Sequence, residues 1–164
     1  MKFLVSCLCF TMLSVQCASN KTVDEIKNSN QKNTLFIYKQ YSRGFYKEVH
    51  INASRAKTYH NYQKTEITEK ALSQKEWEQC FALSKTVNLS ELETLKAPSN
   101  LRQTDRVHHG ELIVENGTYN IKSRCFFDHG NPPTEIKLLV DHLLHISSLN
   151  TVSYTHLRAH ETRH

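Results

Sequence analysis

The sequence predicts an α+β domain in which an antiparallel sheet of about five strands carries two helices on one face. β-rich runs separated by turn residues occur before residue 70 and again after residue 110. Two other segments carry apolar residues at helical spacing, and each begins with helix-start signals. The expected order is therefore β-β-β-α-β-β-α, in which both helices shield the same apolar sheet face.

The first three predicted strands lie between residues 34 and 68. The runs "TLFIYKQY" (34–41) and "FYKEVHIN" (45–52) are joined by "SRG", where Gly44 supplies the positive φ that a tight hairpin requires. The second run alternates as a half-buried strand does, with Phe45, Lys47, Val49 and Ile51 opposed to Tyr46, Glu48 and His50. The segment 57–68, "KTYHNYQKTEIT", is rich in Thr and Tyr and is predicted as one further strand.

The clearest local signal predicts a helix in "LSQKEWEQCFALSKTV" (72–87). Ser73 and Glu76 form a capping box, and Leu72 with Trp77 forms a hydrophobic staple. The predicted buried stripe is Trp77, Cys80, Phe81 and Val87. A short helical turn, "LSELETL" (89–95), follows and ends before a proline that cannot extend it.

The second half predicts a hairpin followed by a helix. In "ELIVENGTYNIKSRCFF" (111–127), Asn116 and Gly117 predict a type I′ turn between two strands. One strand face is expected to carry Tyr119, Ile121, Ser123, Cys125 and Phe127. The final helix should begin with Asn131 as N-cap, Pro132 in the first turn and Glu135 near the positive dipole end. Its predicted buried stripe is Ile136, Leu139, Val140, Leu143 and Ile146.

The N-terminal segment predicts export. Residues 1–17 have an early Lys and an apolar run too short for a comfortable membrane span, which is typical of a secretory signal. The stretch "SVQCASN" resembles a relaxed lipobox, in which Cys17 becomes the lipidated first residue and anchors the protein to a membrane. The alternative is ordinary cleavage near Ala18. Residues 18–33 are polar and are predicted to be a flexible tether.

The C-terminal stretch "VSYTHLRAHETRH" (152–164) shows no apolar periodicity. It back-translates in one frame to the end of a sequencing adapter, and Thr151 fits the same frame. We therefore expect residues 151–164 to be an artefact and exclude their histidines from the functional analysis. The alternative is a disordered, His-rich tail that binds metal. One domain is expected over residues 34–150.

Charge and cysteine content limit the possible functions. Without Lys2, Arg158, Arg163 and Glu161, the formal net charge falls from +5 to about +3. This mild excess is scattered along the chain and does not indicate a nucleic-acid partner. After Cys17 only Cys80 and Cys125 remain. In an oxidising envelope they form a disulfide, or they remain two buried thiols; the sequence leaves both open.

Acidic and imidazole side chains in the second half provide weak metal candidates, and the sequence predicts no cofactor. His142 and His145 are three apart on a predicted helix, but the general-base Glu of an HExxH motif is absent. No catalytic triad, phosphate-binding glycine loop or activated cysteine is evident, so a non-enzymatic protein is expected. A metal-binding or hydrolytic domain is the alternative, using Asp128, His129, His142 and His145 from a wider set that includes Asp105, His108 and His109.

Two loop regions are candidates for other roles. The hairpin "YSRGFY" combines an arginine with aromatic residues, which dominate interface hot spots, so its six residues are predicted to bind a partner: Tyr41, Ser42, Arg43, Gly44, Phe45 and Tyr46. The alternative is a hairpin whose aromatics pack inward around a solvated arginine. The loops "PSNLRQTDR" and "FFDHGNPP" are expected to be neighbours, locked by Asp128 through loop amides or through Arg102 or Arg106.

The segments "SRGFYKEVHIN" and "TDRVHHGELIVENGTYNIKSRCFFDHGNPPTEIKLLVDHLL" are similar in layout to emfourin-like domains over residues 34–146. They also resemble Bacteroidetes-type envelope lipoproteins with an "SRG" hairpin and an "FDHGNPP" turn. The first resemblance implies inhibition of thermolysin-like metalloproteases through Ser42–Phe45, although Arg43-Gly44 replaces the usual glycine pair. The expected protein is therefore a lipid-anchored envelope domain that binds a protease or another envelope protein. A purely structural envelope component is a further alternative.

Overall fold

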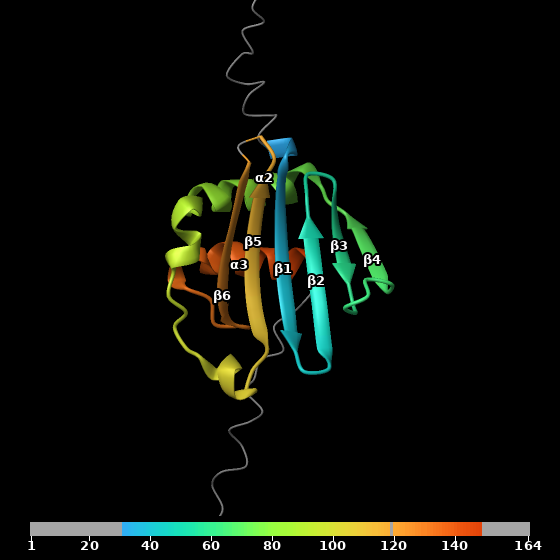
Figure 1. The fold of residues 1–164 in the computed structure, drawn as a ribbon. Coiled ribbons are helices and arrows are strands. Elements are labelled where there is room, and N and C mark those ends of the chain that lie inside the picture. Colours follow the sequence, from blue (N-terminus) through green and yellow to red (C-terminus); the bar gives the residue numbers. More distant parts are fainter. Residues whose placement is uncertain (1–30, 119, 149–164) are drawn as a thin grey trace, which may run out of the picture.

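The computed structural model describes residues 31–118 and 120–148 (Figure 1). It confirms the α+β class and the two helices, and it has six strands rather than about five. The elements are β1 (Thr34–Ser42), β2 (Phe45–Ile51), β3 (Arg55–Tyr59), β4 (Ile67–Ala71), α2 (Gln74–Lys85), the 3-10 helices η1 (Leu89–Thr94) and η2 (Leu101–Thr104), β5 (His109–Asn116), β6 (Ile121–Asp128) and α3 (Thr134–Ile146).

The strands form one antiparallel sheet in the order β4-β3-β2-β1-β5-β6. The first four strands run as a meander, and β5 then returns to pair with the free side of β1. β1 is the longest strand and pairs along most of its length with both β2 and β5. The tip of the β1–β2 hairpin, the start of β5 and η2 consequently lie at the same end of the sheet (Figure 1).

The extra strand arises from the segment predicted as one strand over residues 57–68. It divides into β3 and β4, which pair with each other. Asn61 makes the turn: its side chain accepts a hydrogen bond from the Thr65 amide at 2.9 Å, and its carbonyl accepts one from the Lys64 amide at 3.1 Å. Lys64 takes a left-handed φ of 55° in this turn. Local hydrogen bonds from asparagine therefore outweigh the strand preference of the neighbouring residues.

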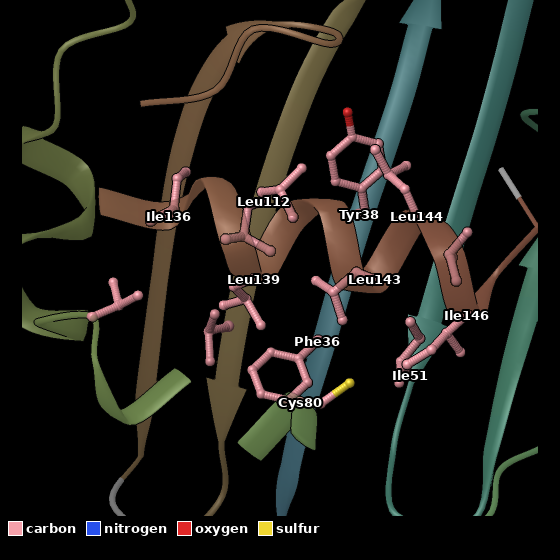
Figure 2. Packing of buried hydrophobic residues seen from close by; sticks show 14 of the residues in the cluster. Phe36, Tyr38, Ile51, Cys80, Leu112, Ile136, Leu139, Leu143, Leu144 and Ile146 are labelled. Carbon is pink, nitrogen blue, oxygen red and sulfur yellow. The ribbon is translucent and has the colours of Figure 1, made fainter. Parts of the chain in front are cut away.

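Both helices cover one face of the sheet, here called the inner face, and α3 runs across the strands (Figures 1 and 2). Phe36, Leu112 and Cys125 contribute from the strands to one buried cluster with Trp77 of α2 and Leu139 of α3. In Figure 2 the apolar side of α3 points at the inward side chains of β1, β2 and β5. The predicted stripes of both helices are confirmed, except that Phe81 is only partly buried.

Helix α2 begins as its local sequence predicts. Ser73 is the N-cap, its hydroxyl accepts from the Glu76 amide, and the Glu76 carboxylate accepts from the Ser73 amide. This reciprocal capping box satisfies two backbone donors that would otherwise be unpaired at the helix start. Trp77 follows directly and packs on Phe36 with ring centroids 5.7 Å apart.

The predicted start of the last helix is wrong by two residues. Asn131 is not its N-cap: Pro133 occupies that position without a side-chain cap, and the helix begins at Thr134. Asn131 instead donates from its amide to the Asp128 carbonyl at 2.8 Å and from its side chain to Ser99 Oγ at 2.8 Å. The residue before a proline is biased away from the helical region, so Pro132 and Pro133 delay the helix.

The predicted type I′ turn at Asn116 and Gly117 is also wrong, although the hairpin exists. Asn116 pairs with Ile121, which leaves a four-residue connection, and Gly117 does not take the positive φ that a type I′ turn requires. The Gly117 amide donates to the Asn33 carbonyl at 3.1 Å, and Asn120 takes φ 50°. This contact with residue 33, far away in sequence, decides the turn.

Several predictions concern residues that are differently placed or not described. Of the predicted inward face of β6, Ser123, Cys125 and Phe127 are buried, whereas Tyr119 and the Ile121 side chain lie outside the description. The predicted tether does not extend to residue 33, because residues 31 and 32 are helical and residue 33 is hydrogen-bonded. Cys17 and residues 151–164 lie outside the described residues.

No helix in the described part of the chain is long and apolar enough to cross a membrane.

The two remaining cysteines are free thiols, so the disulfide alternative does not hold in this structure. Both side chains are buried, and burial raises the pKa of Cys80 to about 12 and that of Cys125 to about 11. The negative charge of Glu76 adds to the shift at Cys80, while Arg102 opposes the shift at Cys125. Because the thiolate is the reactive form, both groups act as small apolar side chains.

The position of α3 gives a direct test of the core. Leu139 is 1% exposed and Leu138 is 69% exposed, although they are neighbours on the same helix. We expect Leu139→Ala to lower the free energy of unfolding by about 2–5 kcal/mol, because it removes buried methyl groups and leaves a cavity. Leu138→Ala should change it by less than about 0.5 kcal/mol. Urea denaturation of both variants checks this, and equal effects would contradict the described packing of α3.

Candidate functional site

The β1–β2 hairpin projects from one end of the sheet with a two-residue tip. Ser42 pairs with Phe45, so Arg43 and Gly44 form the turn, and Gly44 takes the predicted positive φ of 79°. Arg43 and Gly44 are exposed, and the four flanking residues are partly buried. The sequence-based expectation of a tight glycine hairpin with an accessible arginine is confirmed.

Each aromatic residue of the hairpin packs on a ring from another segment. Tyr41 stacks on His109 with centroids 4.9 Å apart and planes 8° apart. Phe45 contacts the ring of His108 at 4.4 Å, and Tyr46 contacts that of Tyr62 at 4.2 Å. The aromatics therefore do not all pack inward as the alternative expected: Tyr41 and Tyr46 lie opposite each other on the outer face, and Phe45 lies on the inner side.

The outer face, away from both helices, holds a buried carboxylate. Glu48 is only 2% exposed. Its Oε2 accepts a short hydrogen bond from the Tyr46 hydroxyl, and its Oε1 makes a short contact with His50 Nε2 and accepts from Lys64 Nζ at 3.0 Å. Neighbouring side chains, not a helix, thus bury this carboxylate.

These contacts determine the protonation of Glu48. Burial by itself would raise the pKa of Glu48, but the hydrogen bonds with His50, Tyr46 and Lys64 outweigh burial and hold the pKa at about 2. Burial and the hydrogen bond to this carboxylate raise the pKa of Tyr46. Glu48 is therefore ionised and Tyr46 protonated at neutral pH, which leaves a buried negative charge on the outer face.

A second buried carboxylate lies two strands away on the same face. Glu111 pairs across the sheet with Lys39, which also pairs with Glu48, so the three charged residues form one row. Lys39 Nζ lies 3.3 Å from Glu111 Oε2. The row is completed towards the edge by Tyr59, opposite Glu48. Alternating charge lets a polar row remain buried, since each carboxylate has a cation beside it.

Asp128 makes the loop contacts that the sequence analysis expected of it. Its carboxylate accepts from Ser99 Oγ at 2.5 Å, from the Leu101 amide at 2.8 Å, and from the Arg102 amide and guanidinium at 3.0 and 2.9 Å. Burial would raise the pKa of Asp128, yet these bonds lower it to about 2. The two loops are neighbours as predicted, and the contact is structural.

Two histidines, His108 and His129, lie between the Asp128 contacts and the β1–β2 hairpin. Tyr38 Oη and His129 Nδ1 share a buried hydrogen bond of 2.7 Å, and Gln40 Nε2 lies 2.9 Å from His108 Nδ1. The His129 amide donates to the His108 carbonyl at 2.9 Å. Burial lowers the pKa of both imidazoles, and that of His129 falls to about 4 because His108 and Lys47 also disfavour its charge.

The predicted metal candidates are not brought together. Asp128 is engaged by Ser99, Leu101 and Arg102, and His129 is bonded to Tyr38. His142 Nε2 faces the Glu76 carbonyl at 3.4 Å, and His145 is exposed in the last turn of α3. Across residues 31–118 and 120–148, no group of three or more His, Cys, Asp or Glu side chains is placed to hold a metal ion.

Sequence reasoning missed Glu48, Tyr59, Tyr62 and Lys64 as parts of a site. The alternation of the second strand placed Tyr46, Glu48 and His50 on one face, and that spacing was the available signal. It could not reveal the lysine, which is sixteen positions further along the chain and reaches back through a turn. Comparisons of the chain with family models, curated proteins and solved structures found no match.

The buried state of His129 predicts a pH dependence of stability. Burial holds the pKa of His129 in the folded chain at about 4, below the ordinary histidine value of 6.5, so the unfolded chain binds the proton more readily. Stability is therefore fully present above pH 6.5 and is lost as the pH falls towards 4, by up to about 3 kcal/mol. We expect His129→Gln to remove most of this slope, measured by denaturant unfolding from pH 4 to 7.

The control for this experiment is His145→Gln, at an exposed position. It should keep the wild-type slope. Above about pH 5, where carboxyl groups are ionised in both states, any slope that remains in His129→Gln should come from His108, whose pKa is also lowered by burial. Glu48 and Asp128 contribute at lower pH, since their folded pKa values of about 2 lie below their usual values. A variant slope equal to that of the wild type would refute the assignment to His129.

Proposed function

We propose that this chain is a non-enzymatic protein-binding domain of a bacterial cell envelope, and that residues Tyr41–Tyr46 contact its partner. One observation carries the proposal: an exposed arginine is presented by a hairpin whose three aromatic residues are each packed on a ring from elsewhere in the chain. These packed rings limit how far the tip can move.

A rigid tip of this composition favours binding on energetic grounds. Arginine and tyrosine are the residues enriched among interface hot spots. Ordering a flexible loop on association costs free energy for each immobilised side chain, so a loop that is already ordered loses less. The stacking of Tyr41 on His109 and the tilted contact of Tyr46 with Tyr62 supply that order before a partner arrives.

The hydrolytic and metal-binding alternative has less support. Asp128 and His129 already hold the segment before β5, through Leu101 and the His108 carbonyl, and His142 and His145 are on α3 facing elsewhere. A general base needs free access to a substrate proton, and a metal site needs several ligands directed at one point. A purely structural envelope component is the remaining alternative, and the Arg43 experiment below distinguishes it.

The resemblance to emfourin-like domains suggests a specific version, in which the partner is a thermolysin-like metalloprotease. Ser42–Phe45 would then be the inhibitory segment. The structure supports this version only in that these residues form an exposed two-residue turn with its flanks. Arg43 in place of a glycine adds a long cationic side chain at the contact, which makes the arginine the most informative position to change.

Arg43→Ala tests the proposed function. We expect the variant to fold as the wild type does and to lose at least about tenfold in partner affinity, because hot-spot truncation costs 1–2 kcal/mol or more. Retention of envelope proteins on the immobilised domain, followed by titration of the retained partner, measures this. Inhibition of thermolysin at micromolar concentrations, by wild type but not by Arg43→Ala, measures the specific version.

The matched control is Lys75→Ala, which removes one positive charge from the exposed surface of α2. It should leave binding unchanged. If Arg43→Ala and Lys75→Ala retain the same proteins with the same affinity, the hairpin is not the binding site and the purely structural reading is favoured. If neither the wild type nor Arg43→Ala inhibits thermolysin, only the protease version of the proposal is refuted.

We further propose that the domain is exported and anchored through a lipid on Cys17. The signal-like residues 1–17 and the stretch "SVQCASN" support this. We expect intact-mass spectrometry of the membrane-extracted protein to show removal of the residues before Cys17 and the added mass of acyl chains. Cys17→Ala should abolish the acyl mass and release the domain from the membrane fraction. An unmodified N-terminus near Ser19 would instead indicate ordinary cleavage near Ala18.

A further inference from the structure

The outer face contains an arrangement suited to a cation. Glu48 is ionised and buried there, and Tyr59 lies opposite it on the neighbouring strand. Lys64 Nζ is 3.0 Å from Glu48 Oε1 and 5.0 Å from the centroid of the Tyr59 ring. A carboxylate combined with an aromatic face is the combination that proteins use to recognise ammonium groups.

The cation now in this position comes from a turn that is held in an unfavourable conformation. Lys64 has φ 55°, a left-handed value that is unfavourable for residues with a Cβ. Its side chain is nevertheless 43% exposed, so the ammonium can leave for water without crossing a packed core. Lys64 can therefore move away from Glu48 without a rearrangement of the core. Glu48, in contrast, requires a nearby cation to remain buried and charged.

We propose that Glu48 and Tyr59 form a binding site for a lysine side chain of the partner protein, and that Lys64 occupies this site in the unbound chain. Glu48 Oε2 is taken by Tyr46, and Oε1 is shared between His50 and Lys64. Departure of Lys64 frees one acceptor position. A compact ammonium fits one position, whereas a guanidinium is suited to two. The ligand class is accordingly a primary alkylammonium.

This site is continuous with the proposed partner-binding hairpin, and the inference rests on that proposed function. Tyr46 belongs to the hairpin and donates to Glu48, which is two residues further along β2, or about 7 Å. Tyr62, whose ring contacts that of Tyr46, is 57% exposed and lies on the same turn as Lys64. A partner that contacts Arg43 therefore has a path over Tyr46 and Tyr62 to the lysine site.

The experiment uses n-butylammonium as the probe, because it reproduces the end of a lysine side chain. Lys64→Gly is the variant of choice, since glycine accepts φ 55° and the substitution removes the occupying ammonium without straining the turn. We expect n-butylammonium to raise the thermal midpoint of Lys64→Gly in a saturable manner at low salt. Its apparent affinity should be about tenfold tighter than for the wild type.

Two controls isolate the site. Lys57→Ala removes the second ammonium group that lies over the Tyr59 ring. The carboxylate that Lys57 contacts, Glu69, is already substantially exposed, so this variant should respond to n-butylammonium as the wild type does. Lys64→Gly combined with Glu48→Gln should lose the saturable response. 1-Butanol at equal ionic strength should have no saturable effect on any form.

The outcomes are separable from those of the Arg43 experiment. A missing response in Lys64→Gly, or one that 1-butanol or Lys57→Ala reproduces, overturns the lysine site and leaves the Arg43 result standing. A charge-specific response in Lys64→Gly that Glu48→Gln abolishes supports the site, whether or not Arg43→Ala weakens partner binding. If Arg43→Ala binds the partner as tightly as the wild type does, only the hairpin proposal is overturned.

Discussion

The burial of β1 between two strands and beneath two helices is the constraint on which the rest of the structure depends. Its inward residues Phe36 and Tyr38 belong to the same cluster as Trp77 and Leu139, and its edges bind β2 and β5. The apolar area removed from water in this cluster is the main stabilising contribution to a domain of this size. Because β1 pairs in register with β2 and β5, it also determines which residues of those strands face outward.

The outer face follows from that register. Positions opposite Lys39 on both neighbours are glutamates, so the central strand supplies a cation between two carboxylates. Glu48 has additional partners in Tyr46, His50 and Lys64, and its low pKa reflects them. A buried charge of this kind is tolerated only when all its hydrogen-bonding positions are satisfied, which explains why residues from β2 and from the β3–β4 turn meet there. The proposed lysine site uses this requirement for a cation.

The hairpin end of the sheet is held from both sides. Asp128 fastens the loop around η2, and the next residue, His129, bonds to Tyr38 and to the His108 backbone. His108 and His109 then contact Phe45 and Tyr41 on the two faces of the hairpin. The loop contacts and the exposed Arg43 thus belong to one connected set of contacts. Rigidity at this end depends on the contacts between the end of β6 and the segment before β5 as much as on the hairpin itself.

The sequence by itself determined the features that depend on neighbouring residues: the capping box at Ser73, the apolar stripes of α2 and α3, and the positive φ of Gly44. Each arises from contacts within a few positions along the chain, where spacing alone defines geometry. The β3–β4 division, the Asn116 turn and the start of α3 were mispredicted, because Asn61, Asn33 and the pair Pro132 and Pro133 outweighed the local pattern. Only the tertiary structure decided that Glu48 is buried, that Lys64 reaches it, and that Cys80 and Cys125 are buried, unpaired thiols. Those outcomes depend on residues far apart in sequence, whose proximity arises only when the whole sheet has assembled.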